Sequence, residues 1–169
     1  MPRSFDLSAN YQGSVAQVHA AFADEQYWLA RLADSGADDA TLDALEVAAD
    51  GAIDVATTQV LRADRLPGFV AQFHQGDLHI KRAESWSAIS GDRATATVAA
   101  RIPGAPASVH GSGKLTPDGA GAKADLKVTV EVKIPLVGGK VEAFIGSQLV
   151  ELLISEQRFT TAWILDRQH

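Results

Sequence analysis

The chain has 169 residues, 46% of them hydrophobic and 21% charged, so we expect a single domain over residues 1–169 with a buried core. Fifteen Lys and Arg residues against 21 Asp and Glu residues give a net charge of −6, which argues against a nucleic-acid binder and weakens the case for docking on anionic lipid surfaces. No cysteine is present, so disulfides, thiol nucleophiles and cysteine metal sites are excluded.

Signals for export or membrane insertion are missing from the sequence. The N-terminus has no apolar stretch and carries Asp6 early, so no signal peptide is expected. The longest apolar stretch, from Val141 to Leu165, is interrupted by charged residues such as Glu151 and is not a membrane span. We therefore expect a cytoplasmic protein with no stable membrane insertion.

The first third of the chain predicts a strand and two short helices. Residues 3–11 alternate between apolar and polar side chains, which is typical of a half-buried strand. Ser14 is expected to cap a helix over residues 15–22. Asp24 is expected to cap a second short helix that includes residues 27–32.

The middle of the chain changes to a period of two, which predicts strands. The strands expected from this alternation span residues 45–49, 53–61, 78–86, 95–102, 107–116 and 125–134. Asp50-Gly51, between the first two, is a signal for a type I′ hairpin. Apolar and polar residues alternate strictly from Asp125 to Ile134, which favours a sheet with one buried face.

A long amphipathic helix is predicted at the C-terminal end, after Pro135 and Gly138-Gly139. Its apolar stripe consists of Val141, Phe144, Ile145, Leu149, Leu152, Phe159 and Trp163. Glu142, Glu151 and Arg158 are expected on the opposite, polar face.

This order of elements resembles the START-like (SRPBCC) superfamily, also called the helix-grip or Bet v 1-like fold, which includes polyketide cyclases and lipid-transfer proteins. The resemblance is carried by residues 5–11, by residues 14–22 with Trp28 behind them, and by the strand–Pro–Gly-Gly–helix junction over residues 128–142. That junction is similar to an uncharacterised actinobacterial branch, a domain of unknown function. The resemblance implies an α+β fold in which a curved antiparallel sheet of about seven strands wraps around the long C-terminal helix. It also implies two short helices after the first strand, and an apolar cavity between sheet and helix.

The residues themselves leave the cavity open as a question. The inward candidates on the strands are Val55, Leu78, Ile80, Trp86, Val98, Val109, Leu126, Val128 and Val130. Small residues share these strand faces, namely Ala94, Ala96, Ala100, Gly111 and Gly113. Small residues opposite large ones either let the helix sit closer, giving a closely packed core, or leave space for a ligand.

Arg82 and Glu84 form the polar pair of greatest interest, because alternation places both on the inward face that carries Trp86. Burying either charge alone would be costly, so the two should pair or bind a polar ligand group. In one interpretation they anchor a carboxylate, hydroxyl or ketone in an apolar pocket. In the other they form an ion pair at the rim, or a bulge returns both to water.

The expected ligand-binding residues are Arg82, Glu84, Trp86, Phe69, Phe73, Phe144, Leu149 and Leu152. Phe69 and Phe73 are candidates for a gate where residues 67–73 and 103–106 meet the end of the C-terminal helix. The alternative for both is a cap over the core.

The sequence contains no strong motif for a metal site or for a catalytic nucleophile. His74 and His79 with Asp77 lack a third nitrogen ligand, so no metal site is expected. His110 is expected on the solvent-facing side of its strand, and His19 on a helix surface. No nucleophile elbow, phosphate loop or dinucleotide motif is present, and no cofactor is expected.

We therefore expect a non-enzymatic protein that binds or transports a hydrophobic small molecule, such as a lipid, an acyl chain or a polyketide-like compound. The first alternative is an aromatase/cyclase-type enzyme, with Glu84 as its acid–base group and His110 a poor second. The second alternative is a structural or signalling partner protein with a filled core and an exposed apolar patch. The sequence leaves the oligomeric state unknown.

Overall fold

The computed structural model describes residues 2–66, 68 and 75–167. In chain order the elements are β1 (Arg3–Tyr11), α1 (Val15–Phe22), α2 (Glu25–Asp34), β2 (Asp39–Val47), β3 (Ile53–Leu61), the 3₁₀ turn η1 (Ala63–Arg65), β4 (Leu78–Trp86), β5 (Ala94–Arg101), β6 (Ala107–Asp118), β7 (Gly121–Val132) and α4 (Gly138–Asp166). Phe69 and Phe73, predicted as a gate, lie outside the described residues.

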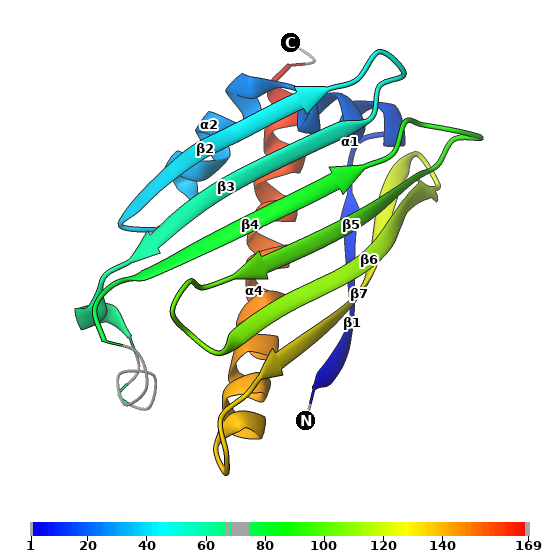
Figure 1. Ribbon diagram of the computed structural model, residues 1–169. Coiled ribbons are helices and arrows are strands. Elements are labelled where there is room, and N and C mark those ends of the chain that lie inside the picture. Colours follow the sequence, from blue (N-terminus) through cyan, green and yellow to red (C-terminus); the bar gives the residue numbers. More distant parts are fainter. Residues whose placement is uncertain (1, 67, 69–74, 168–169) are drawn as a thin grey trace.

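The strands form one seven-stranded antiparallel sheet in the order β1-β7-β6-β5-β4-β3-β2. This sheet curves around α4, which runs along its concave face, while α1 and α2 cover the upper end (Figure 1). The N-terminus lies at the lower end and the C-terminus at the upper end (Figure 1). The predicted α+β helix-grip fold is therefore confirmed.

Local signals set the starts of the short helices as predicted. Ser14 closes a capping box at α1, because its hydroxyl accepts from the Gln17 N–H at 3.1 Å while its own N–H donates to Gln17 Oε1 at 2.9 Å. Asp24 caps α2 by accepting from the Gln26 N–H at 2.9 Å.

The hairpin after β2 is where predicted, but its turn type differs. Gly51 has a φ of +99°, whereas Asp50 is not among the residues with positive φ, and a type I′ turn needs both. The Gly51 N–H donates to the Ala48 carbonyl at 2.9 Å, and the Asp50 carboxylate accepts from the Ala52 N–H at 3.0 Å. The loop is thus a three-residue turn that ends in a left-handed glycine.

The buried core consists of two clusters at opposite ends of the concave face. The upper cluster joins α1 and α2 to the sheet through residues such as Val18, Phe22, Trp28, Ile53 and Trp86. The lower cluster consists of Val130, Val132 and Val141, with Phe5, Ala107, Val109, Ile134, Ile145 and Leu149 packed against it.

Glycines allow α4 to pack closely on β1, and β6 to pack closely on β7. A Cβ on Gly146 of α4 would lie 2.2 Å from the Phe5 ring, so only glycine lets α4 pack so closely on β1. Cβ atoms on Gly111 and Gly113 of β6 would lie 2.5 and 2.3 Å from backbone carbonyl oxygens of β7. The sheet can therefore bend at β6, where larger residues would collide.

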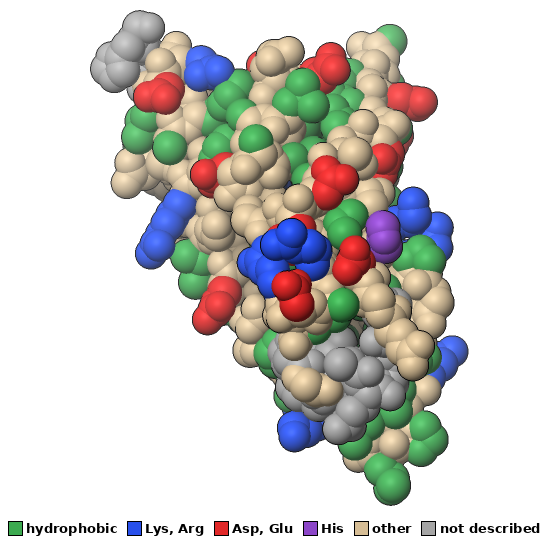
Figure 2. Space-filling view, turned by 90° about the vertical axis from the view of Figure 1, so that its left-hand side faces the viewer, with side chains coloured by type: hydrophobic (Ala, Val, Ile, Leu, Met, Phe, Trp, Pro, Cys, Tyr) green, Lys and Arg blue, Asp and Glu red, His purple; other side chains and the backbone are tan. Residues whose placement is uncertain are grey.

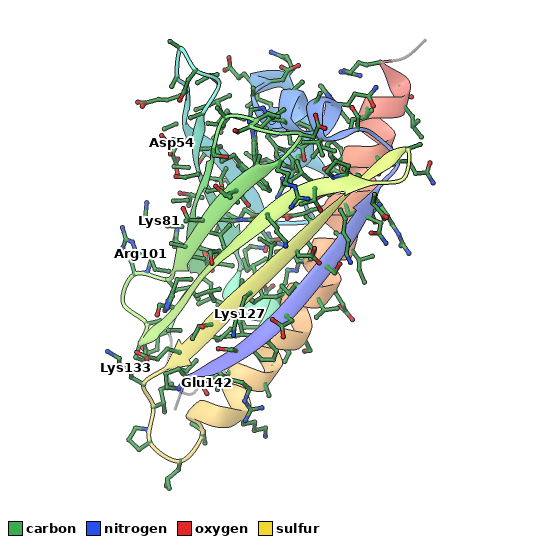
Figure 3. All side chains as sticks on the ribbon, turned by 90° about the vertical axis from the view of Figure 1, so that its right-hand side faces the viewer. Asp54, Lys81, Arg101, Lys127, Lys133 and Glu142 are labelled. Atoms are coloured by element: carbon green, nitrogen blue, oxygen red, sulfur yellow. The ribbon has the colours of Figure 1, made fainter. Side chains whose placement is uncertain are left out.

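Two polar residues expected on the surface are buried instead. Glu142 is 1% exposed (Figure 3). Its buried Oε2 accepts a hydrogen bond from the Val132 N–H at 2.9 Å, so the last backbone N–H of β7 has a partner. His19 is 8% exposed, and its Nε2–H donates to the Ser87 carbonyl at 2.9 Å. Both predictions were wrong because a neighbouring strand end, invisible in the helical pattern, supplies the partner.

None of the helices among the described residues combines the length and apolar character that a membrane crossing requires.

Candidate functional site

The middle of the concave face is less buried than its two ends. We call its inward-facing residues the central patch: Ile80 of β4, Val98 and Ala100 of β5, and Gly111 of β6, together with Val109 of β6, which also packs against the lower cluster; all are half-buried. Neighbours in the flanking clusters are nearly inaccessible, with Ala96 at 4% and Val130 at 0% exposure. The concave face thus keeps accessible apolar surface between the two clusters.

Of the two outcomes left open for the small residues, close packing is seen at Ala94 and Ala96. Ala94 and Ala96 are 1% and 4% exposed because the upper cluster packs onto them. Ala100, Gly111 and Gly113 are half-buried, and the Val128 and Leu126 side chains lie 2.6 and 2.4 Å from where a Cβ on Gly111 and Gly113 would stand. The pairing register places half-buried residues of β5 beside the predicted polar pair, since Val98 lies opposite Glu84 and Ala100 lies opposite Arg82.

Arg82 and Glu84 point inward and belong to a four-residue ion cluster. Arg82 forms a bidentate pair with Glu156 of α4, at 2.7 and 2.9 Å, and its Nη2 also donates to Glu84 Oε1 at 2.5 Å. Arg31 of α2 reaches the same Glu156 carboxylate at 2.5 Å. The pair is therefore neither at the rim nor returned to water, and the ion cluster joins α2, α4 and β4.

Hydroxyl groups extend the ion cluster from Arg31. The Thr160 hydroxyl donates to the Glu156 carbonyl at 2.7 Å, so it accepts from the Tyr27 hydroxyl at 2.6 Å. The Tyr27 oxygen in turn accepts from Arg31 Nη1 at 3.1 Å. The Arg31 guanidinium also lies over the Trp28 ring, 4.6 Å from its centroid. Arg31 is thereby held in one position.

The ion cluster balances its own charge. Burial alone would raise the pKa of Glu156, but Arg31 and Arg82 outweigh it and lower that pKa from 4.5 to about 2. Burial opposes the charged form of Arg31, yet Glu156 and Tyr27 raise its pKa well above the ordinary value. Burial also raises the pKa of Tyr27, which keeps its hydroxyl protonated. Two cations therefore face two anions, with no net charge left over for an ionic ligand.

A small cavity adjoins the ion cluster. Its volume is about 30 Å³, and it is lined by Trp28, Arg31, Leu32, Asp34, Ser35, Thr57, Gln59, Arg82, Leu152, Ser155, Glu156 and Phe159. A polar cavity of that size accommodates about one water molecule rather than an acyl chain. A larger ligand does not fit this cavity. The structure offers it either the central patch or an open hollow of about 580 Å³, which is lined by Asp34, Glu151, Ile154, Ser155, Arg158, Phe159 and Ala162.

The predicted ligand-binding residues separate into groups. Arg82, Glu84 and Leu152 come together at the ion cluster and its cavity. Trp86 is 6% exposed and packs against Phe22 with ring centroids 4.8 Å apart, so it belongs to the upper cluster. The two remaining described residues, Phe144 and Leu149, are half-buried on the lower part of α4. Ligand contact by these side chains stays a prediction.

Arg31 and Glu156 were missed as site residues, although the sequence held a signal for both. Arg31 follows Tyr27 and Trp28 at helical spacing, so it shares their buried face. Glu156 lies four residues after Leu152, on the apolar stripe of α4. Charges of opposite sign on two buried helix faces could have been matched as partners.

The part of the chain that the structure describes contains no candidate metal centre. Within residues 2–66, 68 and 75–167, no group of three or more His, Asp or Glu side chains could hold a metal ion. His110 is exposed on the convex side of β6, as predicted, and His79 is also exposed.

Comparison with known proteins places the chain in a family. Residues 6–164 match the family described as "Protein of unknown function (DUF2505)". The chain belongs to this family. An uncharacterized protein of Mycobacterium tuberculosis is 47% identical to it, over 97% of this chain and 98% of that protein.

Solved structures share the fold at low sequence identity. The protein TTHA0849 from Thermus thermophilus has a TM-score of 0.63 and 15% identity, over 99% of this chain and all of that one. Norcoclaurine synthase from Thalictrum flavum has a TM-score of 0.55 and 12% identity, over 98% of this chain and 87% of that one. The predicted Bet v 1-like, START-type resemblance is confirmed at the level of fold.

Proposed function

We propose that this protein binds a small, largely apolar molecule on the central patch, with a polar group of the ligand directed at Glu84. The observation that carries the proposal is the half-buried apolar surface of Val98, Ala100 and Val109 on central strands of a concave sheet. Apolar surface in this position contributes about 25 cal/mol per Å² when a ligand covers it. Binding of this kind would suit a carrier or a store of the ligand.

The ion cluster defines the polar end of the ligand. Both Nη atoms of Arg82 already donate to carboxylates, and the cluster has no excess positive charge. Among the described residues, Glu84 Oε2 accepts no hydrogen bond, although the Glu84 residue is only 6% exposed. A hydroxyl or another neutral donor fits such an acceptor, whereas a ligand carboxylate would be repelled by it.

Displacement of the neutral dye Nile red tests the proposal, with a long-chain alcohol and the fatty acid and methyl ester of the same chain length as competitors. The alcohol should compete about tenfold better than the fatty acid at neutral pH, which corresponds to about 1.4 kcal/mol. Val98→Phe fills the central patch and should weaken binding of all three compounds. Thr97→Phe places the same ring on the convex face and serves as its matched control.

Two results would contradict the proposal. One is equal binding by wild type and Val98→Phe; the other is the absence of dye and alcohol binding in the folded wild type. Glu84→Gln should reduce the preference for the alcohol, and a variant that keeps it unchanged would show that Glu84 does not contact the ligand. Gentle native mass spectrometry with solvent extraction then identifies any ligand that co-purifies.

A further inference from the structure

Two uncharged loop segments lie side by side towards the lower part of the molecule. The β5–β6 loop consists of residues 102–106, and the apolar part of the β7–α4 loop consists of residues 134–137. The Lys133 N–H donates to the Pro106 carbonyl at 2.8 Å, which joins the two loops. We call these two segments the lower loops. Figure 1 shows the β7–α4 loop at the narrow end opposite α1 and α2, with the β5–β6 loop higher, at the side of the sheet.

The β7–α4 loop presents a leucine to solvent. Leu136 is 104% exposed, and the next residue, Val137, is 40% exposed. Leu136 also has a φ of +71°, in the left-handed region that costs free energy for a residue with a branched side chain. The chain thus adopts an unfavourable backbone conformation at the residue whose apolar side chain projects furthest into water.

Cations surround the lower loops. Arg101 precedes the first loop, and Lys133 and Lys140 bracket the second, each with an exposed side chain. The guanidinium of Arg3 lies beside the start of α4, directly after this loop, since a Cβ on Gly139 would lie 3.7 Å from Arg3 Nη2. Figure 3 shows Lys133 near this end and Arg101 higher on the sheet, beside Lys81, and the lowest end of Figure 2 carries hydrophobic and basic side chains.

The carboxylates of Glu142 and Glu131 offset little of the charge of Lys133. Glu142 is turned inward and accepts from the Val132 N–H, so its carboxylate does not reach the surface. Glu131 lies 3.4 Å from Lys133, but the Lys133 side chain remains 78% exposed. In a chain with a net charge of −6, the described residues around the lower loops therefore form a locally basic end.

We propose that the lower loops dock reversibly on an anionic lipid bilayer, with Leu136 in the headgroup region and the cations against lipid phosphates. A protruding apolar side chain flanked by cations is the combination that binds interfaces of anionic lipid. A stable protein partner needs about 800 Å² of matching surface on each side, which a narrow end built from two short loops does not offer. The negative charge elsewhere orients the chain with this end toward the membrane.

Co-sedimentation with vesicles tests this docking. The full chain is mixed with vesicles of phosphatidylcholine alone or of phosphatidylcholine and phosphatidylglycerol, at low and high salt. We expect binding to the anionic vesicles that weakens with salt. Leu136→Ser should weaken binding to the anionic vesicles by about ten- to a hundredfold. This factor corresponds to the free energy gained when a leucine side chain leaves water for an apolar environment. Lys133→Glu should weaken binding by about tenfold or more, because each cation near the surface is worth about fivefold.

Matched controls separate docking from general stickiness. Val47→Ser removes another exposed apolar side chain, 49% exposed at the β2–β3 hairpin, and Lys114→Glu reverses an exposed charge on β6. Both should bind vesicles like wild type, and Leu136→Ser should keep the wild-type melting temperature. The proposal is overturned if lower-loop and control variants bind alike, or if wild type prefers neutral vesicles. If the wild type binds neither kind of vesicle, the proposal is also overturned, and the remaining role for Leu136 is contact with a protein partner at this end. Ligand binding on the central patch is measured separately and is unaffected by either result.

Discussion

Replacement of Glu156 by glutamine tests the ion cluster most directly. Glu156 holds two arginines, Arg31 and Arg82, and its side chain is only 15% exposed. Glutamine keeps the shape of the side chain but removes the charge, so both arginines lose their strongest partner and face Glu84 alone. Breaking a buried ion pair from one side typically costs about 3–5 kcal/mol, because an uncompensated buried charge remains.

The pKa of Glu156 gives an independent magnitude and the direction of the pH dependence. Folding lowers this pKa from 4.5 to about 2, and each pKa unit corresponds to about 1.4 kcal/mol, so the ionised group stabilises the fold by about 3 kcal/mol. A lowered folded-state pKa means that the stabilisation is complete above pH 4.5. It is lost as the pH falls from 4.5 towards 2, where the folded state also binds the proton.

Urea unfolding at a series of pH values between about 7 and 3 measures both effects. At neutral pH, Glu156→Gln should lower the free energy of unfolding by about 3 kcal/mol or more. The difference from wild type should shrink as the pH falls below 4.5, since only the wild type loses this stabilisation. Glu151→Gln, an exposed glutamate on the same helix, is the control and should change little. If the difference in unfolding free energy between wild type and Glu156→Gln stays constant across this pH range, the reasoning is refuted.

Two further substitutions test the contacts around the ion cluster and the helix. Tyr27→Phe removes the hydroxyl that accepts from Arg31 and donates to Thr160, and urea unfolding should show a loss of about 1–3 kcal/mol. Gly146→Ala places a methyl group against the Phe5 ring and should cost about 1–3 kcal/mol in the same assay. Adding Phe5→Leu to Gly146→Ala should recover part of that loss; no recovery would mean that this contact does not limit the packing of α4 on β1.

Local patterns predicted most of the fold because they act within a few residues. The strands at 3–11, 53–61 and 78–86 have the predicted bounds, since strict alternation marks both faces of each strand. β2 instead begins at Asp39, because a register shift between Leu42 and Ala44 breaks the alternation that would have revealed it. Helix α4 begins at Gly138 without a side-chain cap, so no capping residue marked its start.

Only part of the candidate site could be predicted from the sequence, and the reason is physical. Alternation alone shows that Arg82 and Glu84 face inward, and the cost of burying charge shows that each needs a partner. The main partner, Glu156, lies 74 residues from Arg82, and only the curvature of the sheet over α4 brings the two together. Glu142 is a second case, because its acceptor role depends on where β7 ends against α4.

The ion cluster and the central patch are best understood together. Replacing a buried ion pair by apolar residues of similar volume is often neutral or stabilising, so stability alone does not explain why Arg82, Glu84 and Glu156 lie between two apolar clusters. Apolar side chains at these positions would let the two clusters merge and bring α4 onto the middle of the sheet. The bidentate Arg82–Glu156 pair instead fixes α4 at the distance of two long polar side chains from β4. Val98 and Ala100 consequently keep accessible surface on the concave face, and this is the space that the proposed ligand requires.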